Sequence, residues 1–324
     1  MIYDDLVYGK VEINEAIILD IIASPYMQRL KWIDQSWYFE QFFPWCTYSR
    51  FEHSVWVYLL LKKYWASLEE QISGLIHDIS HWTFSHCLDY IFDEWDQKKQ
   101  NHQDNIFEEF LRSTDIPQIL KKFWLNVEYI LDDSRHLLKE NNLPDICADR
   151  IDYSLRTLVY FDKKPATDIL DHLKVDNQIW FFDDFEYAKS FAEMFKRIND
   201  TYFSNIETAI MFQTVWDLFR YAWKKWYVQK DDFYTTDEQI LNKVKQYLDK
   251  DEKIYLYRQR MNNIIKCKNN PDDFDAHIFC KNRVVDPFFE YNWKLLRVSE
   301  LDNDWKETIK NKNQPKEYFL KFDK

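Results

Sequence analysis

The sequence contains very little glycine. Only Gly9 and Gly74 occur among 324 residues. Folds whose phosphate site is a glycine-rich loop, such as P-loop proteins and dinucleotide-binding βαβ units, need several glycines at fixed spacing. These folds are therefore excluded, and phosphate could be bound here only by metal ions or by basic side chains.

Cysteine is sparse and scattered. The five cysteines are odd in number and include no Cys-x-x-Cys pair. Neither a disulfide framework nor a zinc knuckle fits this distribution. We expect reduced, partly buried thiols at Cys46, Cys87, Cys147, Cys267 and Cys280.

Positive charge and long apolar runs are also lacking. The formal net charge is −12, which disfavours extended binding to nucleic acid or to an anionic membrane. No apolar run reaches the roughly 18 residues of a membrane-spanning helix, and the N-terminus lacks the layout of a signal peptide. The sequence predicts a cytoplasmic protein.

Large aromatic residues and helical periodicity dominate what is present. Aromatics make up 19% of the chain, and each buries much area. Residues 2–13 alternate around Gly9 as in a short β-hairpin. Apolar residues then recur at three- and four-residue spacing, which predicts helices. The expected helices span 14–34, 50–66, 68–80, 84–95, 103–113, 116–132 and 144–160.

The second half predicts further helices followed by a mixed region. Residues 175–184 could form a short strand, 185–230 two amphipathic helices, and 236–248 a weaker helix. From residue 250 onward, KIYLY and HIFCKNRVV read as short strands. The predicted fold is mainly α, with an N-terminal hairpin and helical domain over 1–165 and a helical, mixed α/β extension over 166–324.

Histidines gather in two short stretches. Five of the eight lie between residues 53 and 102, four of them in RFEHS and HDISHWTFSH. On a helix His77 and His81 would lie one turn apart, with Asp78 near enough to share a metal with His77. His53 and Asp149 complete a candidate set of two imidazoles and two carboxylates.

This ligand set leaves coordination positions open. Mixed nitrogen and oxygen ligands suit iron, manganese or magnesium, and the lack of thiolates argues against structural zinc, although zinc could be carried by the protein as purified. Such an ion supports phosphoester hydrolysis. Arg50 and Arg150 are placed to bind phosphate, and His81, His86 and His102 could transfer protons.

Each of these residues also has a structural interpretation. A lone histidine on an aromatic-rich helix is more often a core or surface residue than a ligand, and only the combination favours a metal site. Asp89 could orient the ring of His86 or could simply be a solvated carboxylate. Asp152 and Arg156 could be an ordinary i,i+4 helix pair.

RFEHS, HDISHWTFSH and ADRIDY together resemble the HD-domain superfamily, and within it the deoxynucleoside triphosphate triphosphohydrolases. SPYMQRLKWIDQ at 24–35, SFAEMFKRINDTYF at 190–203 and RVSELD at 297–302 extend the resemblance over most of the chain. It implies an HD-domain helical bundle. The implied ligands are His53, His77, Asp78 and Asp149.

The resemblance also implies the roles of further residues. The implied catalytic group is His81, His86, Asp89 and His102, with His102 protonating the leaving oxygen. Substrate contacts would come from Gln35, Arg50, Arg150, Tyr153 and Tyr202, with Tyr202 stacking beside a deoxyribose.

The sequence therefore predicts a metal-dependent hydrolase of nucleotides, with a dNTP cleaved to deoxynucleoside and triphosphate as the first hypothesis. Nucleoside monophosphates or oligonucleotide ends are alternative substrates for the same chemistry. A non-catalytic nucleotide-binding module is the alternative from another class, which the intact ligand set argues against. The resemblance implies a homo-oligomer, dimer or tetramer.

Overall fold

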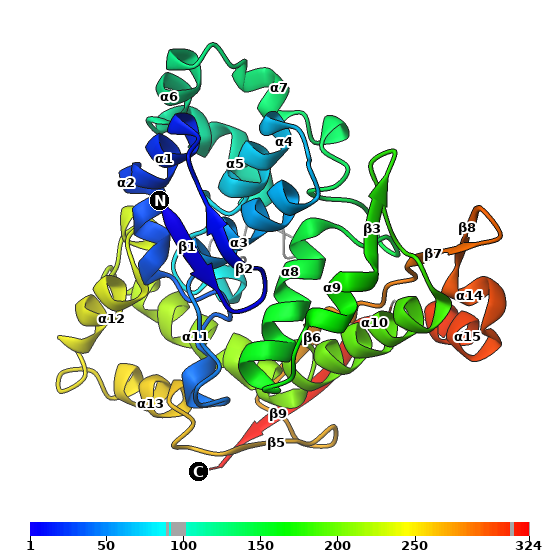
Figure 1. Ribbon diagram of the computed structural model, residues 1–324. Coiled ribbons are helices and arrows are strands. Elements are labelled where there is room, and N and C mark those ends of the chain that lie inside the picture. The colour runs from blue at the N-terminus through cyan, green and yellow to red at the C-terminus, as the bar shows by residue number, and fades with distance from the viewer. Residues whose placement is uncertain (89–90, 92–101, 312–313, 324) are drawn as a thin grey trace.

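The chain begins with a β-hairpin and continues into a mainly helical body (Figure 1). The computed structural model describes residues 1–88, 91, 102–311 and 314–323. Strands β1 (Ile2–Asp5) and β2 (Gly9–Glu12) pair antiparallel. The Asp5 carboxylate accepts the backbone N–H groups of Val7 and Tyr8 and so closes the turn. Gly9, with φ +75°, supplies the left-handed residue.

Eight α-helices form the N-terminal part of the described chain, which is mainly helical as predicted, although the sequence predicted seven helices with other bounds. The central one, α3, begins with a capping box in which Ser49 and Glu52 bond each other's backbone N–H groups. The eight are α1 (Ala16–Ala23), α2 (Pro25–Arg29), α3 (Arg50–Lys63), α4 (Leu68–Ile76), α5 (His102–Ser113), α6 (Ile116–Lys122), α7 (Val127–Leu131) and α8 (Ala148–Arg156).

The C-terminal part is built on two long helices predicted from the sequence, α10 (Phe185–Ile198) and α11 (Ile206–Lys224). Further helices surround them. These are α9 (Thr167–His172), α12 (Asp237–Lys245), α13 (Glu252–Met261), α14 (Val298–Leu301) and α15 (Asn303–Asn311).

Short turns of other helical types punctuate the chain. Two π turns directly extend α8 and α10, and π turns are often found at functional sites. They are η5 (Thr157–Phe161) and η6 (Asn199–Phe203). The 3₁₀ turns are η1 (Leu30–Trp32), η2 (Phe39–Gln41), η3 (Ser85–Leu88), η4 (Asp133–Arg135) and η7 (Lys230–Tyr234).

Two small sheets complete the C-terminal part. The first has the order β3-β4-β7-β8, in which only the β4–β7 pair is parallel. The second has the order β5-β9-β6 and is antiparallel. Their strands are β3 (Leu173–Asp176), β4 (Ile179–Phe182), β5 (Cys267–Asn269), β6 (Ala276–Cys280), β7 (Phe288–Tyr291), β8 (Lys294–Arg297) and β9 (Lys316–Phe322).

Several predicted elements differ from the observed ones. The helix expected over 14–34 is α1, α2 and the turn η1, and the one expected over 116–132 is divided into α6 and α7. The helix expected over 68–80 ends at Ile76, so His77 and His81 do not share a helical face. KIYLY was predicted as a strand and lies in α13, whereas HIFC forms β6 as expected.

The main hydrophobic core crosses the division predicted at residue 165. Val57 and Leu61 of α3 belong to the same buried cluster as Phe182 of β4 and Phe289 of β7. The two predicted parts therefore pack as neighbours along α8 and α10, which lie side by side in Figure 1.

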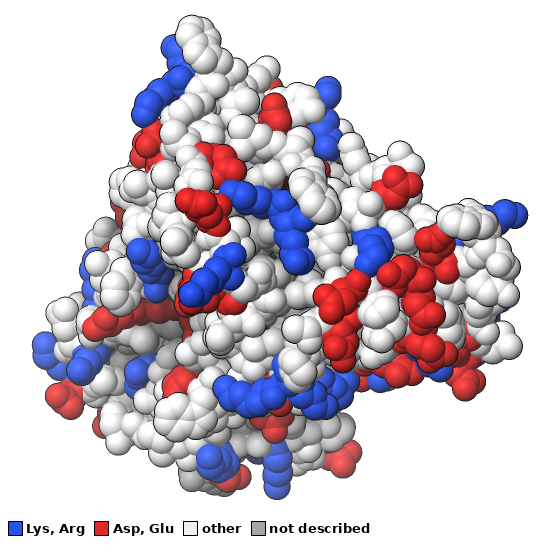
Figure 2. All heavy atoms as spheres, in the orientation of Figure 1, with Lys and Arg blue, Asp and Glu red and all other residues white. Residues whose placement is uncertain are grey.

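The charge distribution and hydropathy agree with the composition. On the face in Figure 2, Lys and Arg side chains are interspersed with Asp and Glu, and acidic side chains gather over the region of α10 and α14. Within the described chain, no helix combines the length and the apolar character that crossing a bilayer requires.

Candidate metal centre

His53 is held between two carboxylates. It lies on α3, is fully buried, and places Nε2 2.9 Å from Asp149 Oδ1 and Nδ1 3.1 Å from Asp152 Oδ2. Both carboxylates come from α8, where residues three apart face the same side. The ring orientation of His53 is therefore fixed by α8.

His77 is oriented by the end of its own helix. It is the C-cap of α4, and its Nδ1 donates to the carbonyl of Gly74 at 2.7 Å. Nε2 then carries the lone pair. This atom is buried and has no hydrogen-bond partner among the described residues. It faces Asp149 Oδ1 at 3.8 Å.

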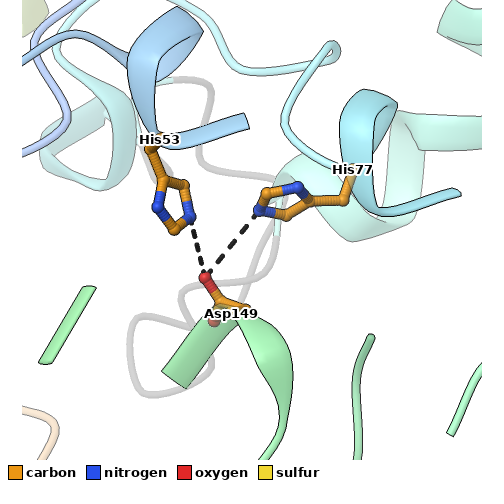
Figure 3. Close-up of side chains that lie close together, drawn as sticks. All are labelled: His53, His77 and Asp149. Atoms are coloured by element: carbon orange, nitrogen blue, oxygen red, sulfur yellow. Dashed lines mark hydrogen bonds and ion pairs between the residues drawn. The ribbon is translucent and has the colours of Figure 1, made fainter. Parts of the chain in front are cut away.

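His53, His77 and Asp149 thus converge from α3, α4 and α8 (Figure 3). Each offers one ligand atom, and these atoms all lie within 4.8 Å of one another. A buried, unpartnered imidazole nitrogen beside a carboxylate is what a divalent cation needs and what an ordinary core avoids. The residues therefore fit a metal ion.

Asp78 lies at the edge of this trio. Its Oδ1 is 3.4 Å from His77 Nε2 and 3.2 Å from His81 Nε2. Its Oδ2 accepts from Arg50 at 2.7 Å in a fully buried ion pair. Burial acts to raise the pKa of Asp78, but Arg50 and the nearby histidines hold it well below its usual range. Asp78 is therefore ionised and has one oxygen turned toward the histidines.

The electrostatics of His53 point to a cation between the same groups. Burial acts to lower its pKa, but the hydrogen bonds that Asp149 and Asp152 accept from the ring outweigh burial and raise the pKa to about 10. The same His53 contact keeps the pKa of the buried Asp149 carboxyl below its usual range. The two carboxylates therefore stabilise a positive charge at this position.

A neighbouring group is less suited to a metal. Glu140, Cys147 and Asp149 also place one potential ligand atom each close together. Burial raises the pKa of the Cys147 thiol, and Glu140 already forms a 2.9 Å ion pair with Arg150. A protonated thiol is a poor ligand, so the His53, His77 and Asp149 trio is the better centre.

Asp152 supports His53 from behind and was missed as a functional residue in the sequence. Besides His53, it accepts from the Tyr8 hydroxyl at 2.6 Å and from Arg156 Nε at 3.2 Å. Arg156 in turn donates to Asp5 of the hairpin. Carboxylates behind metal-binding histidines orient them in this way. Its position three residues after Asp149, on the same helical face, is the sequence feature from which this role could have been predicted.

The trio opens onto a cavity of about 530 Å³. Asp149 and His77 contribute to its wall, and the fully buried His53 stands behind them. Basic residues from distant parts of the chain also face the cavity. They are Arg50, Lys139, Arg150, Lys281 and Arg283.

The structure brings most of the predicted site residues to this cavity. His81 is buried beside Asp78, and burial lowers its pKa so that its ring is neutral. His86 stacks edge-on against it. The predicted residues that line the cavity are Gln35, Arg50, His77, Asp78, His81, His86, Asp149, Arg150 and Tyr153.

Among the predicted residues that the structure describes, Tyr202 lies away from the cavity. Its hydroxyl donates to Asp162 at 3.0 Å while its ring packs on Phe43. Asp89 lies outside the described residues, and His102 opens α5 with its side chain outside them. In place of Tyr202, Asn199 of η6 faces the cavity.

Known proteins resemble this chain in sequence and in fold. The HD domain family model matches residues 50–157, which contain His53, His77, Asp78 and Asp149. The chain is 32% identical over 303 residues to the uncharacterized protein YdhJ of Bacillus subtilis, covering 91% of both chains. A phosphohydrolase structure from Bacteroides thetaiotaomicron superimposes with a TM-score of 0.77 at 16% identity, covering all of both chains.

Two further relatives match only in part. The metal-dependent phosphohydrolase cns2 of Cordyceps militaris is 32% identical over 166 residues, covering 51% of this chain and 47% of that protein. The deoxynucleoside triphosphate triphosphohydrolase SAMHD1 of mouse is 29% identical over 144 residues, covering 38% of this chain and 22% of that protein.

The fold and the relatives together define a helical enzyme, and His53, His77 and Asp149 form its candidate metal centre. The chain belongs to the HD-domain family, and its activity is that of a metal-dependent phosphohydrolase.

Proposed function

We propose that this chain hydrolyses deoxynucleoside triphosphates to deoxynucleoside and triphosphate. One observation carries the proposal: the trio of His53, His77 and Asp149 borders a cavity that five basic residues line, three of them paired with carboxylates. A polyanionic substrate is what such a cavity suits. The partial similarity to SAMHD1 points to the same substrate class.

His53, His77, Asp78 and Asp149 would hold the cation. A divalent ion bound there, with manganese, iron and magnesium as the candidates, supplies Lewis acidity toward a phosphoryl oxygen and toward water. Arg50 keeps Asp78 ionised and in place through its 2.7 Å ion pair.

The substrate would lie across the cavity with its α-phosphate near Asp149. Water attacks the α-phosphorus, the bond between that phosphorus and the 5′-oxygen breaks, and the 5′-oxygen leaves with a proton. His81, kept neutral by burial, and His86 are the described groups placed to move protons. Gln35 and Tyr153 would contact the sugar and base, and Arg150 the phosphates.

Product analysis of the manganese-loaded protein tests this proposal. Wild-type protein and the variants His77→Ala and Asp78→Ala are incubated with dNTPs, NTPs and monophosphates. His277→Ala serves as the matched control, because His277 pairs with Glu317 on the surface sheet. We expect triphosphate from dNTPs with wild type and control alone.

Other products would change the proposed substrate or the proposed function. Phosphate released from monophosphates alone would keep the centre and change the substrate class. Absence of metal-dependent turnover on all of these would favour a nucleotide-binding module. The dimer or tetramer is part of the same proposal, and light scattering during size-exclusion chromatography tests it.

A further inference from the structure

Arg283 is a basic residue of the cavity without a protein acceptor. Arg50 pairs with Asp78, Lys139 with Asp133 and Arg150 with Glu140. Within the described chain, no hydrogen bond or ion pair joins the Arg283 guanidinium to an acceptor, although the side chain is half-buried in the cavity wall. A partly desolvated, unpaired cation is costly unless an anion joins it.

The backbone of Arg283 is held in place by a residue 84 positions earlier. Asn199 begins the π turn η6, is 4% exposed, and accepts the backbone N–H of Arg283 on its Oδ1 at 3.3 Å. Its Nδ2 donates to Asn282 at 2.8 Å and to Ser204 at 3.0 Å. The segment after β6 is thereby anchored against the end of α10.

Arg283 also faces α8, the helix that carries Asp149. Tyr153 lies on α8 one turn after Asp149, and burial raises the pKa of its phenol while the charge of Arg283 opposes that rise. Arg283 and Asp149 therefore line the same cavity, although they are far apart in the sequence.

We propose that Arg283, positioned by Asn199, binds the terminal phosphates of the substrate and so selects triphosphates over monophosphates. This inference rests on the proposed function. Arginine suits the role because its planar guanidinium bonds two phosphate oxygens at once.

Kinetics of Arg283→Met test this role. With dNTP we expect KM to rise roughly 10-fold to 100-fold, the usual effect of losing a hydrogen bond to a charged group, with kcat little changed. Thymidine 5′-p-nitrophenyl phosphate, which has no terminal phosphates, should keep its wild-type KM. Arg283→Lys should recover part of the loss, and Arg112→Gln, an exposed arginine on α5, is the control.

Calorimetry separates this inference from the proposed function. If wild type turns over dNTP and Arg283→Met leaves KM unchanged, the inference is wrong and the function stands. If wild type turns over neither compound, inorganic triphosphate binding decides: weaker binding by Arg283→Met supports the inference, and equal binding overturns it.

A second inference comes from the tryptophans. Six of the 14 have φ between 53° and 73°, a left-handed conformation that bulky residues avoid because of their Cβ. Five of the six are also exposed by 76% or more, so burial of the indole does not offset the strain. The six are Trp37, Trp45, Trp65, Trp124, Trp226 and Trp293.

Three of these tryptophans end helices where glycine is the usual residue. Trp65, Trp124 and Trp226 follow the C-caps of α3, α6 and α11. At each, the next residue's N–H bonds the carbonyl five positions earlier, as in Leu125 to Leu120 at 3.0 Å. This is a Schellman motif, whose left-handed position is usually glycine.

Trp293 occupies another glycine position. Asn292 and Trp293 both have positive φ and join β7 to β8 as a two-residue turn. Asn-Gly is the preferred sequence of such turns. Glycine averages about 7% of residues in proteins, whereas this chain has two glycines and 14 tryptophans.

We propose that these six positions are glycine in the polypeptide that the source cell makes. The codon translated as tryptophan at these positions is then read as glycine by the ribosomes of that cell. At Trp37, which lines the cavity, glycine would widen the wall beside His86.

Peptide mass spectrometry of the protein isolated from its source tests the proposal. Peptides with glycine at positions 65, 124 and 226 would support it, and peptides with tryptophan there would overturn it. In recombinant protein, Trp124→Gly should raise the melting temperature. Trp305→Gly should lower it, because Trp305 is buried and donates to the Val285 carbonyl; a fall with Trp124→Gly would contradict the proposal.

Discussion

Asp152 determines how His53 faces the metal centre. It holds Nδ1 of the ring at 3.1 Å and is itself held by Tyr8 and Arg156. His53, Asp152 and Arg156 are all fully buried, so water has little access to replace a lost partner of the carboxylate. The N-terminal hairpin thus contacts a proposed metal ligand, His53, through one aspartate.

We predict that Asp152→Asn lowers metal affinity roughly 10-fold to 100-fold, as is usual when a group behind a ligand is changed. Competition with a chelating dye measures this affinity. Asp183→Asn is the matched control. The Asp183 carboxylate bonds His172 Nδ1 at 2.7 Å, and neither residue lines the cavity. Equal affinities for the Asp152→Asn variant and wild type would contradict the account.

Among individual site residues, the sequence predicted those that cluster along the chain. His53, His77 and Asp149 follow a recognisable spacing, and the structure brings them together. Asp152 resembled an ordinary helix pair because its partner His53 is 99 residues away. Arg283 had no local signal at all, since only the packing of β6 against the helices places it at the cavity.

Gly74 determines how closely α4 approaches α3. A Cβ at this position would lie 2.4 Å from Leu61 Cδ1 and 3.2 Å from Val57 Cγ1. Both neighbours are fully buried and cannot move into solvent. The Gly74 carbonyl also accepts from His77, so helix spacing and ligand orientation depend on one residue.

We predict that Gly74→Ala lowers the free energy of unfolding by about 1–3 kcal/mol, the usual cost of overpacking a core. Urea denaturation measures it, and metal affinity should fall as well because His77 shifts. Ser73→Ala, the adjacent buried position on α4, is the control. If Gly74→Ala were as stable as wild type, α3 and α4 could move apart without cost, which would contradict the prediction.

Element boundaries were less predictable than element types. The apolar spacing of residues 68–80 suggested one helix, but Arg29 of α2 donates to the carbonyls of Ile79 and His81 and so replaces helical hydrogen bonds. KIYLY has the residues of a strand, yet Asp251 caps it as a helix by accepting the N–H groups of Lys253 and Ile254. Contacts from distant residues determined both outcomes.

Across the whole molecule, α12 is tied to the histidine segment by a pair of half-buried aspartates. Asp237, the first residue of α12, accepts the backbone N–H groups of Asp34 and Phe84 at 2.9 Å and 2.8 Å. Burial raises the pKa of both Asp34 and Asp237 to about 7. The charge of Asp237 adds to the rise at Asp34, whereas backbone hydrogen bonds and Arg50 oppose the rise at both carboxyls.

This pair predicts a pH dependence of stability. A carboxyl whose pKa is raised on folding contributes stability below its unfolded pKa of about 3.8, and that contribution is lost as pH rises through about 7. Asp237→Asn keeps an acceptor oxygen without the charge. Between about pH 4 and pH 8, its urea midpoint should therefore fall less than that of wild type.

Asp231→Asn is the control for this comparison, because Asp231 is an exposed carboxylate in the preceding turn η7. Parallel pH profiles for Asp237→Asn and wild type would contradict the assignment. The predicted division of the chain at residue 165 stays a prediction. The shared core of α3, β4 and β7 leads us to expect that residues 1–165 alone do not fold cooperatively.

We propose above all that His53, His77 and Asp149 bind a divalent cation. Inductively coupled plasma mass spectrometry of the purified protein measures its metal content, with His77→Ala and the surface control His277→Ala alongside. We expect one tightly bound divalent ion per chain in wild type and control, and its loss in His77→Ala. An equal metal content in all three proteins, or none in wild type after reconstitution with manganese or iron, would contradict it.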